Sequence, residues 1–104
     1  MTAIFDEGVP HDLLPLLRKA GCDVARFPKQ WKGTKNGRLL QLIEDAGFAC
    51  LITSDKNMAY QQNLTARPFA VVVLPSNKLE ELKGAAERIA DAIGGAVPGI
   101  VTDL

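Results

Sequence analysis

Two apolar segments of this sequence are each followed directly by a carboxylate. Residues 2–5 lead into Asp6 and Glu7, and residues 49–54 lead up to Asp55. In a parallel α/β sheet the carboxyl ends of the strands share one edge, and ligands bind in the crevice outside that edge. We therefore expect these three acids to meet at one edge of a sheet.

Acids grouped in this way suit Mg²⁺ or Mn²⁺, which prefer hard oxygen ligands with water completing the shell. A cation held beside a phosphodiester acidifies bound water and offsets charge on the leaving oxygen. Asp6 and Asp55 are the predicted direct ligands, and Glu7 is predicted to flank them. The alternative is that each Asp only caps the helix that follows by accepting backbone N–H groups.

A basic and aromatic segment lies between Asp23 and Glu44, where the sequence has no acid. Phe27 and Trp31 alternate there with five cations: Arg26, Lys29, Lys32, Lys35 and Arg38. Spaced cations attract phosphate, and an exposed aromatic ring can stack on a base. A single Trp in a small domain can instead anchor a loop to the core. The predicted substrate-binding residues here are Trp31, Lys32, Lys35 and Arg38.

Four consecutive hydrogen-bonding side chains, Tyr60-Gln61-Gln62-Asn63, follow soon after Asp55. Amides both donate and accept, so they can position water, sugar or phosphate. They serve equally well to satisfy backbone groups in an irregular turn. We assign Gln61 and Gln62 to loop closure and retain Asn63 as a substrate-binding candidate. The one histidine, His11, is interpreted as a surface residue.

The apolar pattern alternates between strands and helices along the chain. Strands are predicted at residues 2–5, 23–27, 49–54, 69–74 and 97–101, the last of them interrupted by Pro98-Gly99. Helices are predicted to end at Gly21, Gly47 and Gly94, with Asn36 and Asn77 as N-caps and a short helix within residues 56–63. This order predicts an α/β fold, a three-layer α/β/α sandwich with a mostly parallel central sheet. Residues 1–104 are predicted to form a single domain.

Composition narrows the function little. Twelve basic and twelve acidic residues cancel, so net charge indicates neither nucleic acid nor a membrane as partner. No apolar run approaches the ~20 residues of a membrane helix, and the first residues have a strand pattern rather than a signal pattern. We expect a cytoplasmic protein in which Cys22 and Cys50 are reduced core thiols.

Several segments resemble the PIN-like domains, and among them a compact bacterial group. The resemblance is densest in Leu51-Ile52-Thr53-Ser54-Asp55-Lys56-Asn57 with Tyr60-Gln61-Gln62-Asn63-Leu64. It also includes Phe5-Asp6-Glu7-Gly8-Val9-Pro10, the stretch from Trp31 to Leu40, and Ala70-Val71-Val72-Val73-Leu74. It covers most of the chain except the C-terminal helix and tail.

The resemblance implies a metal-dependent nuclease, in many relatives a toxin ribonuclease neutralised by a small antitoxin. The family acids at the first strand end and in the Thr-x-Asp motif correspond to Asp6 and Asp55. Two further family acids are replaced, by Asn36 at the helix after the basic loop and by Asn57 two residues after Asp55. Each replacement removes a charge and keeps an oxygen, which weakens divalent binding. The implied catalytic residues are Asp6, Asp55, Asn36 and Asn57.

The implied cofactor is Mg²⁺ or Mn²⁺, with Lys35 holding a phosphate oxygen. The implied partners are RNA, a small antitoxin protein and a second copy of the chain in a homodimer, and no membrane.

Two other readings stay open. A receiver domain also has an acidic pair after its first strand and an Asp after its third, but it needs a Lys-Pro at its last strand. Gly99-Ile100-Val101-Thr102 offers no Lys. A PIN-like module that binds RNA or protein without cutting is favoured by Asn36 and Asn57.

Overall fold

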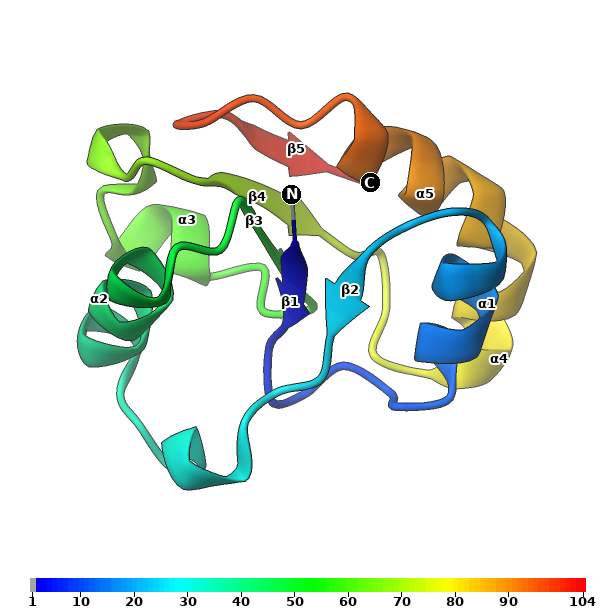
Figure 1. The fold of residues 1–104 in the computed structure, drawn as a ribbon, viewed down its shortest axis with the longest axis horizontal. Coiled ribbons are helices and arrows are strands. Elements are labelled where there is room, and N and C mark those ends of the chain that lie inside the picture. The colour runs from blue at the N-terminus through cyan, green and yellow to red at the C-terminus, as the bar shows by residue number, and fades with distance from the viewer. Residues whose placement is uncertain (1) are drawn as a thin grey trace.

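Five short parallel strands form one sheet in the order β2-β1-β3-β4-β5 (Figure 1). The computed structural model describes residues 2–104 except the side chains of residues 59 and 60, so the Tyr60 side chain lies outside it. The strands are β1 (Ala3–Phe5), β2 (Val24–Ala25), β3 (Cys50–Thr53), β4 (Ala70–Val73) and β5 (Val101–Asp103). Each pair is in parallel register, as in Phe5 opposite Ile52. The sheet is thus parallel throughout.

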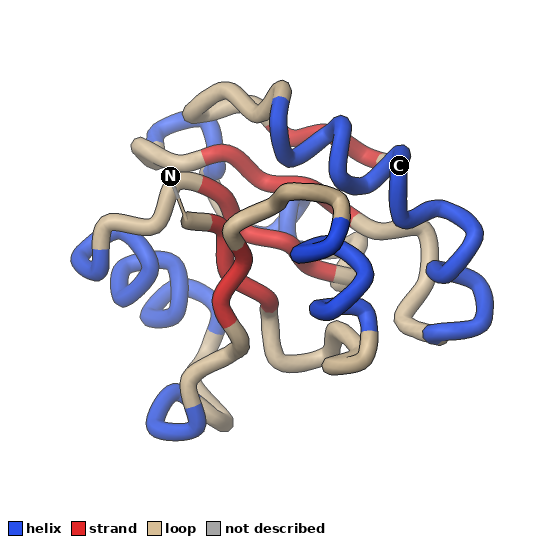
Figure 2. The backbone as a smooth tube through the Cα atoms, turned by 45° about the vertical axis from the view of Figure 1, so that its right-hand side comes forward, coloured by secondary structure: helices blue, strands red, loops and turns tan. Residues whose placement is uncertain are grey.

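Helices cover both faces of the sheet (Figures 1 and 2). They are α1 (Leu13–Lys19), α2 (Asn36–Ala46), α3 (Met58–Gln61), α4 (Leu79–Leu82) and α5 (Ala86–Gly94), with short 3-10 turns η1 (Lys29–Trp31), η2 (Leu64–Ala66) and η3 (Lys83–Ala85). Because alternate strand residues point to opposite faces, Ala3 and Phe5 pack with α1, α4 and α5, whereas Ile4 packs with α2 and α3. The predicted three-layer α/β/α architecture is confirmed. None of the helices in residues 2–104 is long and apolar enough to cross a membrane.

Helix ends follow the glycines in the first half of the chain. Gly21 and Gly47 have φ angles of 93° and 79°, the left-handed conformation that favours glycine. Their prediction as helix ends is confirmed. The prediction of one regular helix from Asn77 is wrong, because α4 begins at Leu79 and the 3-10 turn η3 separates it from α5. Gly84, a poor helix former, lies in that interruption.

The last strand begins later than its sequence pattern suggests. Residues 97–100 form a turn in which the Ile100 N–H donates to the Val97 carbonyl, and Gly99 has a φ of 81°. A strand cannot run through this turn, so β5 starts at Val101. The predicted interruption at Pro98-Gly99 is confirmed as a turn, whereas the predicted strand start at residue 97 is wrong.

The connection from β4 to β5 has the opposite hand to the others. The steps from β3 to β4 and from β4 to β5 go in the same direction across the sheet. The first passes over the face of α2 and α3, and the second over the face of α1. The steps from β1 to β2 and from β2 to β3 share the hand of the step from β3 to β4. Since about 98% of such crossovers are right-handed, the β4–β5 connection is the left-handed one.

Burial gives a physical reason for this reversal. The sheet face opposite α2 and α3 presents Cys50, Ile52, Ala70 and Val72, and it packs against α1, α4 and α5. The single seven-residue helix α1 is too short to cover that face alone. Leu82 and Ile89, both fully buried, supply the missing cover from α4 and α5.

We expect Gly99→Ala to lower the unfolding free energy by at least about 1–2 kcal/mol, the usual cost of a left-handed residue with a side chain. A Cβ atom at Gly99 would also lie 3.0 Å from the Thr65 carbonyl oxygen. Gly84→Ala is the matched control, since a Cβ there has no heavy atom within 4 Å among the described residues. Urea unfolding should show Gly84→Ala unchanged or more stable by up to ~1 kcal/mol. Equal effects of the two changes would contradict the strain at Gly99.

Candidate functional site

A hydrogen-bonded chain joins the ends of the neighbouring strands β1 and β3. The Thr53 hydroxyl donates to Asp6 Oδ2 at 2.7 Å and accepts the Asp55 backbone N–H at 3.0 Å. Thr53 is fully buried, and among the side chains that the structure describes it is the one buried polar group. The Asp6 N–H also donates to the Ile52 carbonyl. Asp6 and Asp55 are therefore held at one edge of the sheet by a shared threonine.

The Asp55 carboxylate has two further contacts. Its Oδ1 accepts the backbone N–H of Asn57 at 3.0 Å, and its Oδ2 accepts the side-chain amide of Asn36 at 3.4 Å. The first contact closes a local turn ahead of α3, whose N-cap is Asn57 and not Asp55, so the capping role considered for Asp55 is not realised. The second reaches across from α2, so the prediction of Asn36 as an N-cap is wrong: Lys35 holds that position, and Asn36 is the first residue of the helix. The structure thus brings Asp6, Asp55, Asn36 and the backbone of Asn57 together.

Glu7 does not join the two aspartates. Its Oε1 accepts the backbone N–H of Gly33 at 3.2 Å, which ties the loop after β1 to the basic loop. Across residues 2–104 no three acidic, His or Cys side chains gather as a metal-binding group. Of the three acids expected to lie together, Asp6 and Asp55 do so, whereas Glu7 is exposed and hydrogen-bonded to Gly33.

These two aspartates lie at the point where the strand order reverses. From β1 the chain crosses by way of α1 to β2, on one side, whereas β3 lies on the other side of β1. Loops leaving adjacent strands toward opposite faces open a crevice there, and this is where α/β proteins bind ligands. The topology and the acids therefore indicate the same place.

The donor set fits a hard divalent cation. Asp6 Oδ1 accepts the Glu7 N–H and Oδ2 the Thr53 hydroxyl, and each oxygen retains a second lone pair. Both aspartates are half-exposed. Mg²⁺ commonly binds through one or two carboxylates and keeps several waters, so Asp6 and Asp55 could hold it, with the amide oxygens of Asn36 and Asn57 in the surrounding shell.

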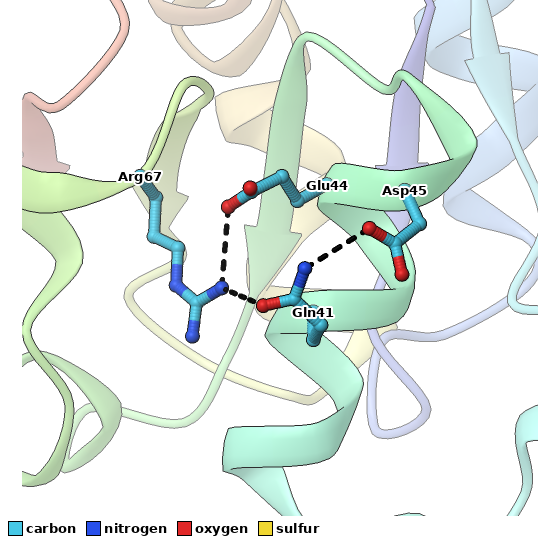
Figure 3. A network of polar contacts seen from close by, with 4 residues as sticks. All are labelled: Gln41, Glu44, Asp45 and Arg67. Carbon is cyan, nitrogen blue, oxygen red and sulfur yellow. Dashed lines mark hydrogen bonds and ion pairs between the residues drawn. The ribbon is translucent and has the colours of Figure 1, made fainter.

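The long helix α2, which carries Asn36, is fixed to the segment before β4 (Figure 3). Arg67 donates to Gln41 at 3.0 Å and pairs with Glu44 at 3.2 Å, and Gln41 donates to Asp45. These groups are partly solvent-exposed, so the ion pair contributes up to about 1 kcal/mol. Its effect on the site is positional, because it holds the helix whose first residue contacts Asp55.

The basic loop carries Trp31 inward. The Trp31 ring meets Phe27 and Phe48 edge-to-face, each with ring centroids 6.4 Å apart, and it packs against the α2 side of the core. This geometry favours the anchoring role for Trp31 over base stacking. The cations at positions 32, 35 and 38 remain exposed.

The amide side chains of residues 61–63 have different surroundings from those that the sequence predicted. Asn63 is exposed and its Oδ1 accepts the Thr65 hydroxyl at 2.8 Å, a local turn before η2. Gln62 is half-buried, and a methyl group at Gly37 would lie 3.7 Å from its Oε1. Gln62, rather than Asn63, is therefore the amide that lies beside the first turn of α2.

Sequence reasoning missed two parts of this edge. Thr53 belongs to the Thr-x-Asp pattern around Asp55, which was a usable signal. The second part is a cleft of about 340 Å³ between the loop after β1 and the loop after β2, lined by Glu7, His11, Phe27, Lys29 and Lys32. The two loops contribute residues that are at least 16 positions apart in the sequence, from His11 to Phe27, so no local pattern shows that they share a cleft.

A larger cavity of about 580 Å³ lies at the opposite, amino-terminal edge, where Ala3 and Cys50 begin their strands. Its lining is mostly apolar, with the Cys22 and Cys50 thiols. Burial, and secondarily the nearby Cys22, raises the pKa of Cys50 to about 12, and burial with Asp91 raises that of Cys22. Such thiols ionise poorly and react slowly. Both cysteines are free, as predicted, and we place the candidate site at the aspartate edge.

We expect Thr53→Val to lower activity at this site by about 10- to 100-fold, the usual effect of removing a group that orients a ligand. The change keeps the buried volume but leaves the Asp55 N–H without its partner, which costs about 1 kcal/mol. Thr53→Ser is the control, because it keeps the hydroxyl and removes only a methyl group. It should lose about 0.8 kcal/mol of stability with nearly unchanged activity. Equal activity in the two variants would contradict the bridging role of the hydroxyl.

Comparison with protein-family models, curated proteins and solved structures gave no significant match. The case for a function therefore rests on the groups at the aspartate edge.

Proposed function

We propose that this chain is a PIN-like, Mg²⁺- or Mn²⁺-dependent ribonuclease that hydrolyses phosphodiester bonds. The observation that carries the proposal is the pair Asp6 and Asp55, fixed through the buried Thr53 hydroxyl at the switch point of a parallel sheet. Two half-exposed carboxylates at such a switch point would suit a hard cation with water in the rest of its shell.

In this proposal Asp6 and Asp55 would hold the cation, which when bound acidifies water and offsets charge on the leaving oxygen. Asn36 orients the Asp55 carboxylate through its amide hydrogen bond. Thr53 fixes the spacing of the two acids. Lys35, exposed beside Asn36 at the start of α2, would bind a phosphate oxygen of the substrate.

RNA as the substrate is supported by the basic segment from Arg26 to Arg38, which spans the loop after β2 and the first turn of α2. Its five cations have no acid among them in the sequence, so they attract a phosphate backbone. With the family resemblance, this extends the proposal to the toxin of a toxin–antitoxin pair acting in the cytoplasm, with a small protein as antitoxin and a homodimer as its assembly.

The test is cleavage of a single-stranded RNA by the purified chain in Mg²⁺, in Mn²⁺ and in EDTA. The expected result is cleavage with either metal and none in EDTA. Cleavage that continues unchanged in EDTA would contradict the metal role. Absence of cleavage with both metals, together with RNA binding, would instead favour a PIN-like module that binds without cutting.

A receiver-like phosphoacceptor is the second candidate, because doubly wound folds of the receiver type share the order 2-1-3-4-5. Two observations count against it. The last strand ends in Asp103 where a receiver needs Lys, and the left-handed β4–β5 connection departs from ordinary doubly wound folds. An acid-labile phosphoryl group on Asp55 after incubation with a small-molecule phosphodonor would support this candidate over hydrolysis.

A further inference from the structure

The cleft beside the aspartates is built by two loops that a hydrogen bond joins. Glu7 follows Asp6 directly and lines the cleft, and its Oε1 accepts the Gly33 N–H of the basic loop. The cleft therefore begins one residue from the aspartate pair. Its volume of about 340 Å³ falls within the ~300–1,000 Å³ typical of small-molecule sites.

The lining combines positive charge with an aromatic wall. Lys29 and Lys32 are both exposed, whereas Phe27 is half-buried and lines the cleft while its ring packs on Trp31. Two ammonium groups outnumber the single carboxylate of Glu7. A positive groove with a fixed aromatic ring is the arrangement by which proteins bind single-stranded nucleic acid.

We propose that this cleft binds one nucleotide of a single-stranded RNA, with its phosphate between Lys29 and Lys32 and its base against Phe27. The inference rests on the proposed function, in that the neighbouring phosphodiester would then lie at Asp6 and Asp55. It assigns base contact to Phe27, because Trp31 is held inward by Phe27 and Phe48.

Glu7 gives the cleft a means of distinguishing RNA from DNA. One of its oxygens accepts the Gly33 N–H, and the other is available to accept a hydrogen bond. A ribose 2′-hydroxyl donates such a bond, and it is the group by which proteins tell RNA from DNA. In this arrangement Glu7 binds the sugar and lies apart from the phosphate held by the lysines.

The test measures binding without cleavage. A fluorescently labelled oligouridine and its deoxy counterpart are titrated with the protein in EDTA, over a range of salt concentrations. Trp31, the single Trp, lies against Phe27 and supplies a second, intrinsic signal. Lys29→Gln and Lys32→Gln should each weaken RNA binding about tenfold and reduce the slope of log K against log salt by about 0.7.

Phe27→Leu should weaken binding at least about fivefold through lost stacking. Glu7→Gln, which keeps an oxygen for Gly33, should narrow the difference between RNA and deoxy binding. Lys19→Gln is the matched control, because Lys19 is an exposed lysine in the last turn of α1, and it should bind like the wild type.

The cleft assignment would be overturned if Lys29→Gln and Lys32→Gln bound RNA with the same affinity and salt slope as Lys19→Gln. It would also be overturned if the wild type did not bind oligouridine. The lysine variants keep this test valid even if Phe27→Leu disturbs the core. Failure of the wild type to cleave RNA in Mg²⁺ or Mn²⁺ is a separate result. It would overturn the proposed hydrolysis, whereas the titrations in EDTA would still show whether the cleft binds RNA.

Discussion

Asp55→Asn and Asp6→Asn should each lower Mg²⁺-dependent RNA cleavage by more than about 100-fold. That loss exceeds the ~10- to 100-fold typical for a residue that only orients a ligand, because each aspartate would contact the cation itself. The amide oxygen can still accept the backbone N–H of Glu7 at position 6 or of Asn57 at position 55. The amide NH₂ can then donate to the Thr53 hydroxyl oxygen or to the Asn36 amide oxygen, so the folded structure should survive. The measurement is the single-turnover rate of RNA cleavage, with circular dichroism to verify folding.

Asp12→Asn is the matched control for this pair. Asp12 is an exposed acid at the start of α1, on the same edge of the molecule, and it makes no side-chain cap of that helix in the described structure. The same loss of charge there should leave the rate within a factor of about two to three of the wild type. If Asp6→Asn and Asp55→Asn cleave as fast as Asp12→Asn, the two aspartates are not the catalytic centre.

Asn36→Asp should make the stability of the protein depend more strongly on Mg²⁺. The Asn36 amide now donates to Asp55 at 3.4 Å, and a carboxylate in its place would face another carboxylate. Without a divalent cation this repulsion opposes the favourable position of an acid at a helix N-terminus, worth about 0.3–1 kcal/mol. A bound cation removes the repulsion and gains a third charged ligand.

Thermal unfolding with increasing MgCl₂ measures the effect without reference to activity. A ligand at 100 times its Kd stabilises the folded state by about 2.7 kcal/mol, and 1 kcal/mol shifts Tm by about 4–8 °C in a domain of 60–100 residues. Asn36→Asp should therefore show a larger Mg²⁺-dependent rise in Tm than the wild type. Asn63→Asp adds the same charge in an exposed turn and should behave like the wild type. Equal responses in both variants would mean that Asn36 does not lie beside a cation site.

The sequence predicted the parts of the fold that depend on local pattern. Buried strands such as β4 have β-branched runs, and left-handed glycines such as Gly47 end helices, so both could be recognised from the residues alone. The start of β5 was predicted too early because Val97 and Ile100 are apolar but exposed, and an apolar residue indicates a strand only when it is buried. Which face α4 and α5 cover could not be predicted either, since an amphipathic pattern shows that a helix has a core side without showing which layer it joins.

The sequence predicted that the two aspartates would lie together, but it did not predict which groups contact them. Asp6 and Asp55 follow from strand ends in a parallel sheet. Asn36 was predicted as a helix cap, but its amide instead donates to Asp55. Glu7 was predicted beside the metal, but its carboxylate instead accepts the Gly33 N–H. Both contacts are tertiary hydrogen bonds that local sequence does not show. Trp31 was predicted with both roles open, and its packing against two other rings favours the anchor.

The left-handed β4–β5 connection separates the part of the chain that forms the candidate site from the part that only covers the sheet. All the groups that meet at the aspartates and in the cleft lie within the first 57 residues, whereas the left-handed excursion begins only after β4 ends at Val73. The final third covers the sheet face that α1 also covers. Its strand β5 pairs with β4 at the edge of the sheet, and its helices pack against α1. Changes of length or sequence in that third that keep the sheet covered should therefore leave Asp6 and Asp55 in place.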